Sequence, residues 1–169
     1  MTDRFDPNIP PAGPTDPAIQ GDFLGIVGIT EQPTLGKSNL VVNAAEAFEL
    51  DVSWHVFGNL VPLWLTALSV ATKEWVVTAY AESQGPGEEK TVGTVTVPVG
   101  GPAFSLDETF KAKIKVPAFT LREENPGDTT ESGVYKIIVT VFLDSDLGPV
   151  GYDMMGYAEG PIIKVEDPQ

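Results

Sequence analysis

The chain has 169 residues, with 24 Asp or Glu against 10 Lys or Arg, so its formal net charge is -14. This length suits one domain with its own hydrophobic core. The sequence has no cysteine and a single histidine, which excludes thiolate metal sites, disulfides, cysteine nucleophiles and any mechanism that needs two histidines. Because so acidic a surface repels phosphates and anionic lipids, nucleic acid and membranes are poor partner candidates.

Residues 1–22 have the composition of an extended arm. They hold five of the fifteen prolines, four acids and one arginine. Proline favours an extended backbone and offers no N–H donor, so we expect the arm to be unstructured in the isolated protein and to bind along a partner. A folded domain is predicted over 23–169. The sequence has no signal-peptide pattern and no Asn-x-Ser/Thr acceptor, which indicates a cytoplasmic protein.

The rest of the chain has the pattern of a series of strands. Apolar and polar side chains alternate over 48–56, 110–116 and 135–143, as in strands with one buried face. Weaker strand patterns occur over 23–29, 63–70, 74–82, 91–97 and 157–165. Seven or eight strands separated by glycine and proline turns predict an all-β, antiparallel sandwich.

One strand carries a row of lysines on its polar face. Lys111, Lys113 and Lys115 alternate with apolar residues. In so acidic a protein, we expect these lysines to neutralise acids on a neighbouring strand rather than to bind nucleic acid.

The segment from Glu131 to Ile137, Glu-Ser-Gly-Val-Tyr-Lys-Ile, resembles the sixth strand of immunoglobulin-like domains. In that family an acid, a glycine and a tyrosine precede the buried position of the second cysteine, which Ile137 takes here. The resemblance implies that the Tyr135 hydroxyl bonds back to the preceding corner of the chain. It further implies that Val52 is the partner of Ile137, and that Trp64 or Trp75 is the tryptophan at the centre of the core. A resemblance of this kind implies a fold and no function.

The motif Gly36-Lys37-Ser38 follows a strand-like segment, as in a phosphate-binding loop. The complete loop needs a further glycine where this chain has Glu31, and a carboxylate there repels phosphate. Pro33 also removes a backbone donor. An ordinary loop is therefore expected.

Three acids near the end of the chain have the oxygen density of a calcium site. Asp144, Asp146 and Asp153 are the candidate metal ligands. The EF-hand pattern fails, because Pro149 and Met155 stand where a glycine and a glutamate are required. The alternative is a turn in which aspartate side chains bond to the backbone.

Two arrangements suggest hydrolysis. Ser53 and His55 share one strand face with Asp51, but no glycine-rich elbow presents the serine, so a surface histidine is expected. The acid pairs Glu88-Glu89 and Glu123-Glu124 lie in predicted turns that face solvent, although paired acids remain the basis of a possible glycosidase-like site.

Residues 56–72 carry no charge. Gly58, Asn59 and Pro62 interrupt this stretch, so a membrane helix is not expected. One interpretation is a loop followed by a buried strand. The other is a protruding apolar loop that docks on another protein. The candidate partner-binding residues of that loop are Leu60, Val61, Leu63 and Trp64. Four further residues would extend such a patch if they lay at the same end: Phe142, Met154, Met155 and Tyr157.

These observations favour a non-enzymatic protein-interaction or structural subunit of a larger intracellular, virion or phage-tail-like assembly. Its partner would be another protein or a second copy, with no cofactor and no membrane insertion. One alternative is a carbohydrate- or calcium-binding sandwich that uses aromatic residues such as Trp64, Trp75 and Tyr152. The other is a small all-β hydrolase.

Overall fold

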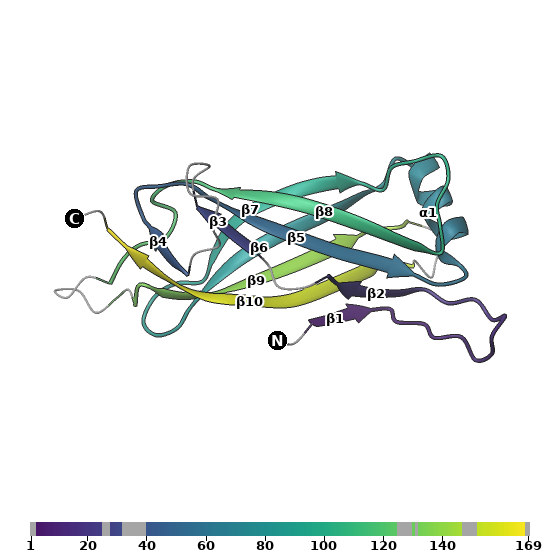
Figure 1. The fold of residues 1–169 in the computed structure, drawn as a ribbon, viewed down its shortest axis with the longest axis horizontal. Helices are drawn as coiled ribbons and strands as arrows, with labels where there is room; N and C mark the ends of the chain where they lie inside the picture. The colour runs from purple at the N-terminus through teal and green to yellow at the C-terminus, as the bar shows by residue number, and fades with distance from the viewer. Residues whose placement is uncertain are drawn as a thin grey trace.

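The computed structural model describes residues 3–24, 28–31, 40–124, 130, 132–146 and 152–167. This part of the chain contains ten strands and one helix (Figure 1). In chain order they are β1 (Asp3–Asp6), β2 (Gln20–Phe23), β3 (Gly28–Glu31), β4 (Val41–Asn43), β5 (Phe48–Phe57), α1 (Val61–Val70), β6 (Glu74–Ser83), β7 (Lys90–Pro98), β8 (Asp107–Val116), β9 (Val134–Leu143) and β10 (Met154–Glu166). The predicted all-β class is confirmed.

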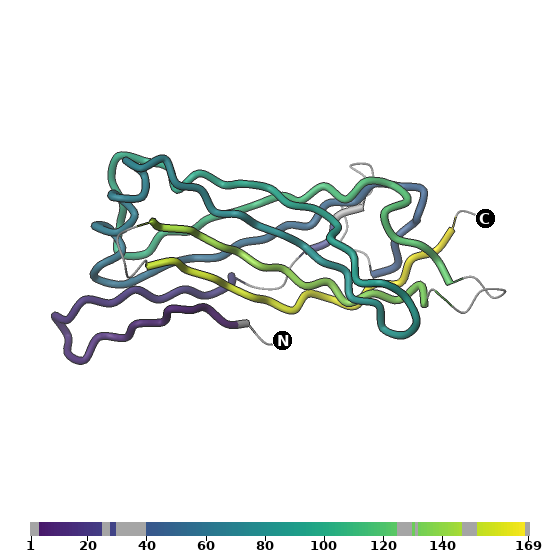
Figure 2. Tube along the Cα trace, turned by 180° about the vertical axis from the view of Figure 1, so that it is seen from behind, coloured from purple at the N-terminus to yellow at the C-terminus, as the bar shows by residue number. Residues whose placement is uncertain are grey.

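The strands form two sheets that pack face to face as a sandwich (Figures 1 and 2). The first sheet has the order β1-β10-β9-β6-β7, and β4 pairs in parallel with the far end of β10. In the second sheet β5 pairs with β8 on one side, and with β2 and then β3 on the other. All the other pairings are antiparallel.

The alternating segments became strands because one face of each is buried between the sheets. β5 and β9 bury every second side chain, and β8 buries Phe110, Ala112, Ile114 and Val116. The weaker patterns over 74–82, 91–97 and 157–165 are strands as well. The pattern over 23–29 falls on the end of β2 and the start of β3, with 25–27 outside the described residues. β1 and β4 were not predicted.

The predicted strand over 63–70 is wrong, because this segment is helix α1. The helix buries Val61, Trp64, Leu65 and Leu68, which have the i, i+3, i+4, i+7 spacing of one helical face. Pro62 lies in the first turn, where the missing N–H costs nothing. An apolar run of this length fits a strand as well as a buried helix, so the proline and the spacing were the usable signals.

Aromatic rings fill the centre of the sandwich. The ring of Trp75 lies 5.6 Å from Trp54, 6.5 Å from Trp64 and 5.4 Å from Phe110, measured between centroids. These four side chains come from β6, β5, α1 and β8 in turn. The helix is thus joined to both sheets through one aromatic cluster.

The corner before β9 has the bond that the tyrosine pattern implied. Tyr135 is buried and its hydroxyl donates to the backbone carbonyl of Arg122, at 3.2 Å. Ile137 and Val52 are buried in the core, as expected. Glu131, the acid of the same pattern, lies outside the described residues.

We expect Tyr135→Phe to lower the free energy of unfolding by about 1 kcal/mol, because it removes a hydroxyl that bonds in the core and leaves the Arg122 carbonyl without that donor. Urea denaturation measures the difference. Tyr80→Phe is the matched control, since Tyr80 lies on an exposed sheet face. Equal effects of the two substitutions would contradict a structural role for the Tyr135 hydroxyl.

The N-terminal segment is not an unstructured arm in this structure. β1 pairs with β10 in one sheet and β2 pairs with β5 in the other, so the segment closes one edge of the sandwich (Figure 2). Phe5, Ala18 and Ile19 are buried. Composition alone did not predict these strands, because only a few apolar residues among the prolines enter the core. The division into an arm over 1–22 and a domain over 23–169 stays a prediction.

Candidate interaction surfaces

The outer face of the β5–β8 sheet is charged and internally paired. Lys113 lies opposite Asp51 in the β5–β8 register, and its ammonium is 2.9 Å from the Asp51 carboxylate and 3.4 Å from Glu49. The hydrogen bond to Asp51 is the main cause that raises the pKa of Lys113. The prediction that the lysine row neutralises a neighbouring strand is therefore confirmed for Lys113.

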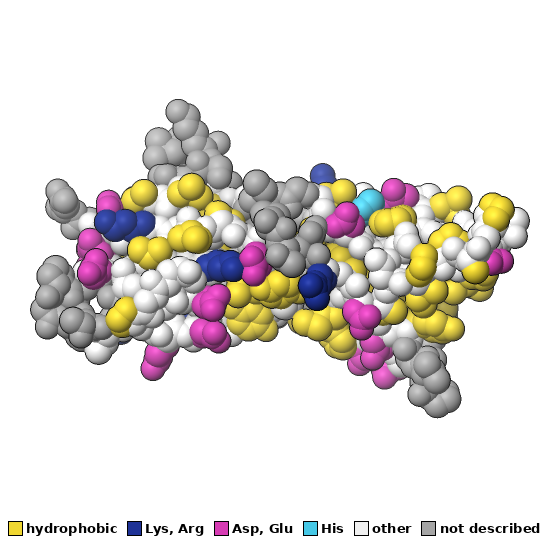
Figure 3. Space-filling view, turned by 90° about the horizontal axis from the view of Figure 1, so that it is seen from below, with side chains coloured by type: hydrophobic (Ala, Val, Ile, Leu, Met, Phe, Trp, Pro, Cys, Tyr) yellow, Lys and Arg dark blue, Asp and Glu magenta, His cyan; other side chains and the backbone are white. Residues whose placement is uncertain are grey.

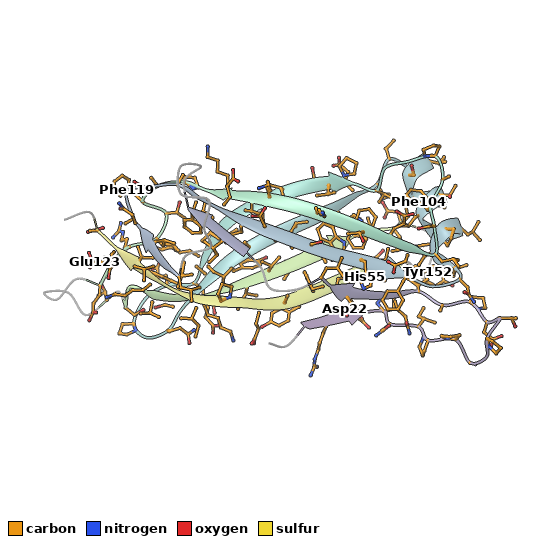
Figure 4. The ribbon with its side chains drawn as sticks, in the orientation of Figure 1. Asp22, His55, Phe104, Phe119, Glu123 and Tyr152 are labelled. Carbon is orange, nitrogen blue, oxygen red and sulfur yellow. The ribbon has the colours of Figure 1, made fainter. Side chains whose placement is uncertain are left out.

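His55 lies on this same face with a partner that the sequence did not indicate. Its Nδ1 is 2.9 Å from an Asp107 carboxylate oxygen, because β8 places Asp107 near it across the sheet. The Ser53 hydroxyl donates to the Phe110 carbonyl at 3.4 Å, so its proton is directed at the backbone rather than at the histidine. In Figure 4 His55 lies on this open sheet beside Asp22. The geometry gives a contact between an imidazole and a carboxylate at the surface, and the Ser53 hydroxyl is not directed at His55.

The three candidate metal ligands have separate bonding partners. Asp153 accepts from the backbone and hydroxyl of Ser145, both at 2.9 Å, and Asp144 accepts from the Asp146 N–H at 3.2 Å. The Asp146 carboxylate pairs with the ammonium of Lys73. Among the described residues no group of three His, Asp or Glu side chains could hold a metal ion. The carboxylates therefore serve as turn and ion-pair groups here, and the geometry lends no support to a cation site.

The Lys73–Asp146 pair predicts a pH dependence of stability. The hydrogen bond from Lys73 lowers the pKa of Asp146 in the folded protein. Its stabilising contribution is therefore present above the ordinary aspartate pKa of about 3.9, and is lost as the pH falls through the lower folded value. We expect Asp146→Asn to reduce the loss of unfolding free energy between about pH 5 and pH 2, measured by denaturation at each pH.

The control for this measurement is Glu74→Gln, an exposed acid on β6. If Asp146→Asn leaves the acid side of the stability curve unchanged, or changes it no more than the control does, the Lys73 pair makes no contribution in solution.

The candidate partner-binding residues lie around the start of α1, and only part of the set is accessible. Val61 and Trp64 are buried in the core, Leu60 is partly buried, and Leu63 is 70% exposed. The predicted protruding loop is thus a helix whose inner face belongs to the core. Leu63 remains a candidate contact, and the partner-binding role of the set stays a prediction.

Other apolar side chains share this end of the molecule. Val70, the last residue of α1, is 82% exposed, and Leu106 is exposed on the neighbouring loop. The Ser69 hydroxyl donates to the carbonyl of Gly101 at 3.0 Å, which holds that loop against the helix. Phe104 and Tyr152 lie at the same end (Figure 4).

The outer face of the other sheet carries a second accessible apolar surface. Val76, Phe142 and Met155 lie side by side on β6, β9 and β10, and are 37%, 40% and 47% exposed. The next row across the same strands consists of Thr78, Thr140 and Tyr157. None of these six side chains is charged in a chain of net charge -14. We call these two rows the outer-face patch.

Charged groups stand at the border of this patch. The Lys136 ammonium is 2.9 Å from Glu159, and the Tyr157 hydroxyl donates to the same carboxylate at 3.2 Å. Burial is the main cause that raises the pKa of Tyr157, and the hydrogen bond from Lys136 lowers that of Glu159. Figure 3 shows hydrophobic and acidic side chains interspersed on the side of the molecule that it views from below. The outer-face patch itself has uncharged side chains in its two rows and charged groups at its border, the arrangement of an apolar centre with a polar rim.

The sequence identified part of the outer-face patch. Phe142, Met155 and Tyr157 were expected to extend the α1 patch, and they lie on the sheet face that begins beside it. Met154, named with them, is buried. Val76 was missed, because strand pairing alone brings it beside Phe142.

Two motifs of the sequence remain. The Gly36-Lys37-Ser38 motif lies outside the described residues. Of the acid pairs, Glu88 and Glu89 are exposed, and Glu123 accepts from the Asp167 N–H at 2.7 Å.

Within the described residues, no helix combines the length and apolar character needed to cross a bilayer. In comparisons with known proteins, no family model and no curated protein matches the chain.

Proposed function

We propose that this chain is a non-enzymatic interaction subunit of a larger protein assembly, intracellular or virion- or tail-like, built on an immunoglobulin-like sandwich. The observation that carries the proposal is the row of Val76, Phe142 and Met155, three accessible apolar side chains on adjacent strands, at the end of the sheet face nearer α1. Contiguous exposed apolar patches with polar rims mark interaction sites, and an apolar centre with a polar rim is the composition of a protein–protein interface.

The immunoglobulin-like assignment is supported by strand order. β5 and β8 correspond to the second and fifth strands of that fold, and β6, β9 and β10 to its third, sixth and seventh. β7 then adds to the first sheet, beside β6, as an extra edge strand. The bond from Tyr135 to the Arg122 carbonyl supports the same assignment.

The two outer sheet faces differ in the way that an interaction subunit requires. The β5–β8 face carries charges that already pair within the face, such as Lys113 with Asp51. A partner that covered it would have to desolvate those charges. The outer-face patch has no charge to desolvate, so burying it gains free energy at about 25 cal/mol per Å² of apolar area.

Site-specific photocrosslinking tests the proposal. A benzophenone amino acid in place of Phe142 should crosslink to a discrete protein in an extract of the source cells, and one in place of Leu63 reports on the α1 end. The same group in place of Lys113, on the charged face, is the matched control. The proposal fails if position 142 yields no discrete adduct, or if position 113 yields the same one.

Once that protein is purified, Phe142→Lys should weaken its binding at least tenfold, because a charge would then occupy the centre of the contact. Thr109→Lys, an exposed position on β8 in the opposite sheet, is the control. Because both positions are exposed, neither substitution should alter thermal unfolding by more than a few degrees.

A further inference from the structure

The edge of the first sheet is occupied by the protein's own N-terminal strand. β1 runs antiparallel along β10, with Arg4 opposite Tyr157, Phe5 opposite Gly156 and Asp6 opposite Met155. Arg4 and Asp6 are exposed, whereas Phe5 is buried. β1 is therefore bound as an extended peptide with one inward anchor, which is the geometry of strand addition.

Two glycines make the slot that receives this anchor. A Cβ at Gly21 would lie 2.5 Å from Cδ1 of Phe5, and one at Gly156 would lie 2.5 Å from Cε1 of the same ring. Neither position can carry a side chain while Phe5 is in place. The ring of Phe23 completes the slot, with its centroid 5.0 Å from that of Phe5. The site is thus shaped for a peptide with an aromatic residue between polar ones.

The connection from β1 to β2 is much longer than the distance between them requires. The two strands are neighbours at the edge of the sandwich, yet residues 7–19 join them in a protruding excursion (Figures 1 and 2). The far part of this excursion is tied to the body, because Asn59 donates to the Asp16 carbonyl and the Leu60 N–H to the Ala18 carbonyl, both at 3.0 Å.

Residues 10–15, which precede these ties, contain no buried side chain. Straightening them therefore exposes no core. The backbone pair between Ile9 and Ile19 is the contact that holds the near side of the excursion together. If that pair opens, residues 3–15 can extend about 40 Å from the tied point, well beyond the radius of gyration of about 15 Å expected for a chain of this length.

We propose that β1 exchanges between copies of this protein, so that Phe5 of one copy fills the slot between Gly21 and Gly156 of another. The second copy is the occupant that the structure supports, since this segment is the peptide seen to fit the slot. Exchange keeps the four β1–β10 backbone pairs and the ring contacts, and it opens the Ile9–Ile19 pair and changes the path of residues 7–15. This contact adjoins the outer-face patch at Met155 and Tyr157, but it is made through the backbone of β10 and the inward ring of Phe5, so it does not depend on the patch.

Crosslinking between two variants tests the exchange, since the chain has no cysteine of its own. One chain carries Arg4→Cys and the other carries Tyr157→Cys. If β1 of the first chain pairs with β10 of the second, the Cα atoms of the two cysteines lie about 5 Å apart. The variants are mixed, unfolded, refolded together in about 1 M salt to screen the repulsion between acidic chains, and treated with a short bis-maleimide. The two variants carry tags of different length, so that denaturing electrophoresis separates the crosslinked heterodimer from crosslinked homodimers and measures its yield.

We expect at least ten times more heterodimer than with Lys113→Cys in place of Tyr157→Cys, because Lys113 lies on the opposite sheet. Adding Phe5→Ala to the Arg4→Cys chain should remove most of the product. The double variant Arg4→Cys/Tyr157→Cys, in one chain at low concentration, should crosslink within itself and so report the register.

Each of three results would overturn the proposal. The first is a heterodimer yield no higher than that of the Lys113→Cys control, although the double variant crosslinks within itself. The second is a yield that Phe5→Ala does not change. The third is a double variant that fails to crosslink, since β1 would then not lie on β10 at all. None of these results bears on photocrosslinking from position 142, so the two proposals fail separately.

Discussion

Replacing Trp75 with alanine should lower the free energy of unfolding by about 3–5 kcal/mol, among the largest effects of any single substitution in this chain. Trp75 is fully buried, and its ring meets rings from β5, α1 and β8. Truncation therefore opens a cavity where the helix and both sheets meet. A neighbouring side chain that moved into this cavity would leave a second cavity behind it. A loss of this size is a large part of the 5–15 kcal/mol that is typical of a whole domain.

The effect comes from packing rather than from a hydrogen bond. Within the part of the chain that the structure describes, the indole N–H of Trp75 has no acceptor. Trp75→Phe, which keeps a ring and removes that N–H, should thus cost much less than Trp75→Ala.

Urea denaturation at neutral pH measures both changes. Val76→Ala is the control, because Val76 is the next residue of the same strand and points to the outer face. We expect it to cost less than about 1 kcal/mol. Similar losses for the alanine variants at 75 and 76 would mean that the aromatic cluster is not the centre of the core.

The strands that the sequence predicted best are those with one solvent-exposed face and one buried face. Residues 48–56 and 135–143 alternate because β5 and β9 each lie between the core and solvent. Helix α1 was missed for the opposite reason. Its outward residues, Leu63 and Val70 among them, are also apolar, so hydrophobicity alone did not reveal its inner face.

The charged sheet face was predictable and the outer-face patch was predictable only in part. A lysine row in an acidic chain requires acids nearby, and Lys113 pairs with Asp51 and Glu49. The patch depends instead on which strands are neighbours. Val76 and Phe142 are far apart in the sequence, and the β6–β9 register alone brings them together.

The N-terminal segment shows how composition can mislead. Its prolines and acids are typical of an unfolded arm, and most of these side chains are exposed. Its structure depends instead on single positions, Phe5 and Ile19, that enter the core, and on glycines elsewhere in the fold that leave room for them. Average composition cannot predict a contact of this kind, because only the pairing of β10 with β1 brings Gly156 beside Phe5.

Phe5→Ala should lower the free energy of unfolding by about 3 kcal/mol, the low end for a buried phenylalanine, because the residue lies at an edge where the chain can partly collapse. Gly156→Ala should cost about 1–3 kcal/mol, since the new methyl group would overlap the Phe5 ring and would lie 2.7 Å from Cγ2 of Val141. Both losses can be measured by urea denaturation of the monomer at low protein concentration.

The two substitutions should not be additive. Once Phe5 is alanine, the methyl group at position 156 meets an empty slot, so Gly156→Ala should cost less there than in the wild-type chain. Gly156→Ala should still lower the free energy of unfolding somewhat in the Phe5→Ala chain, because the overlap with Val141 remains. Gly28→Ala is the matched control: a Cβ there meets Asp51 at an ordinary 3.6 Å, far from Phe5, and its effect should be the same with and without the ring. Strict additivity of the Phe5 and Gly156 substitutions would show that the ring does not occupy the slot, and the edge of the sandwich would then have to be closed in another way.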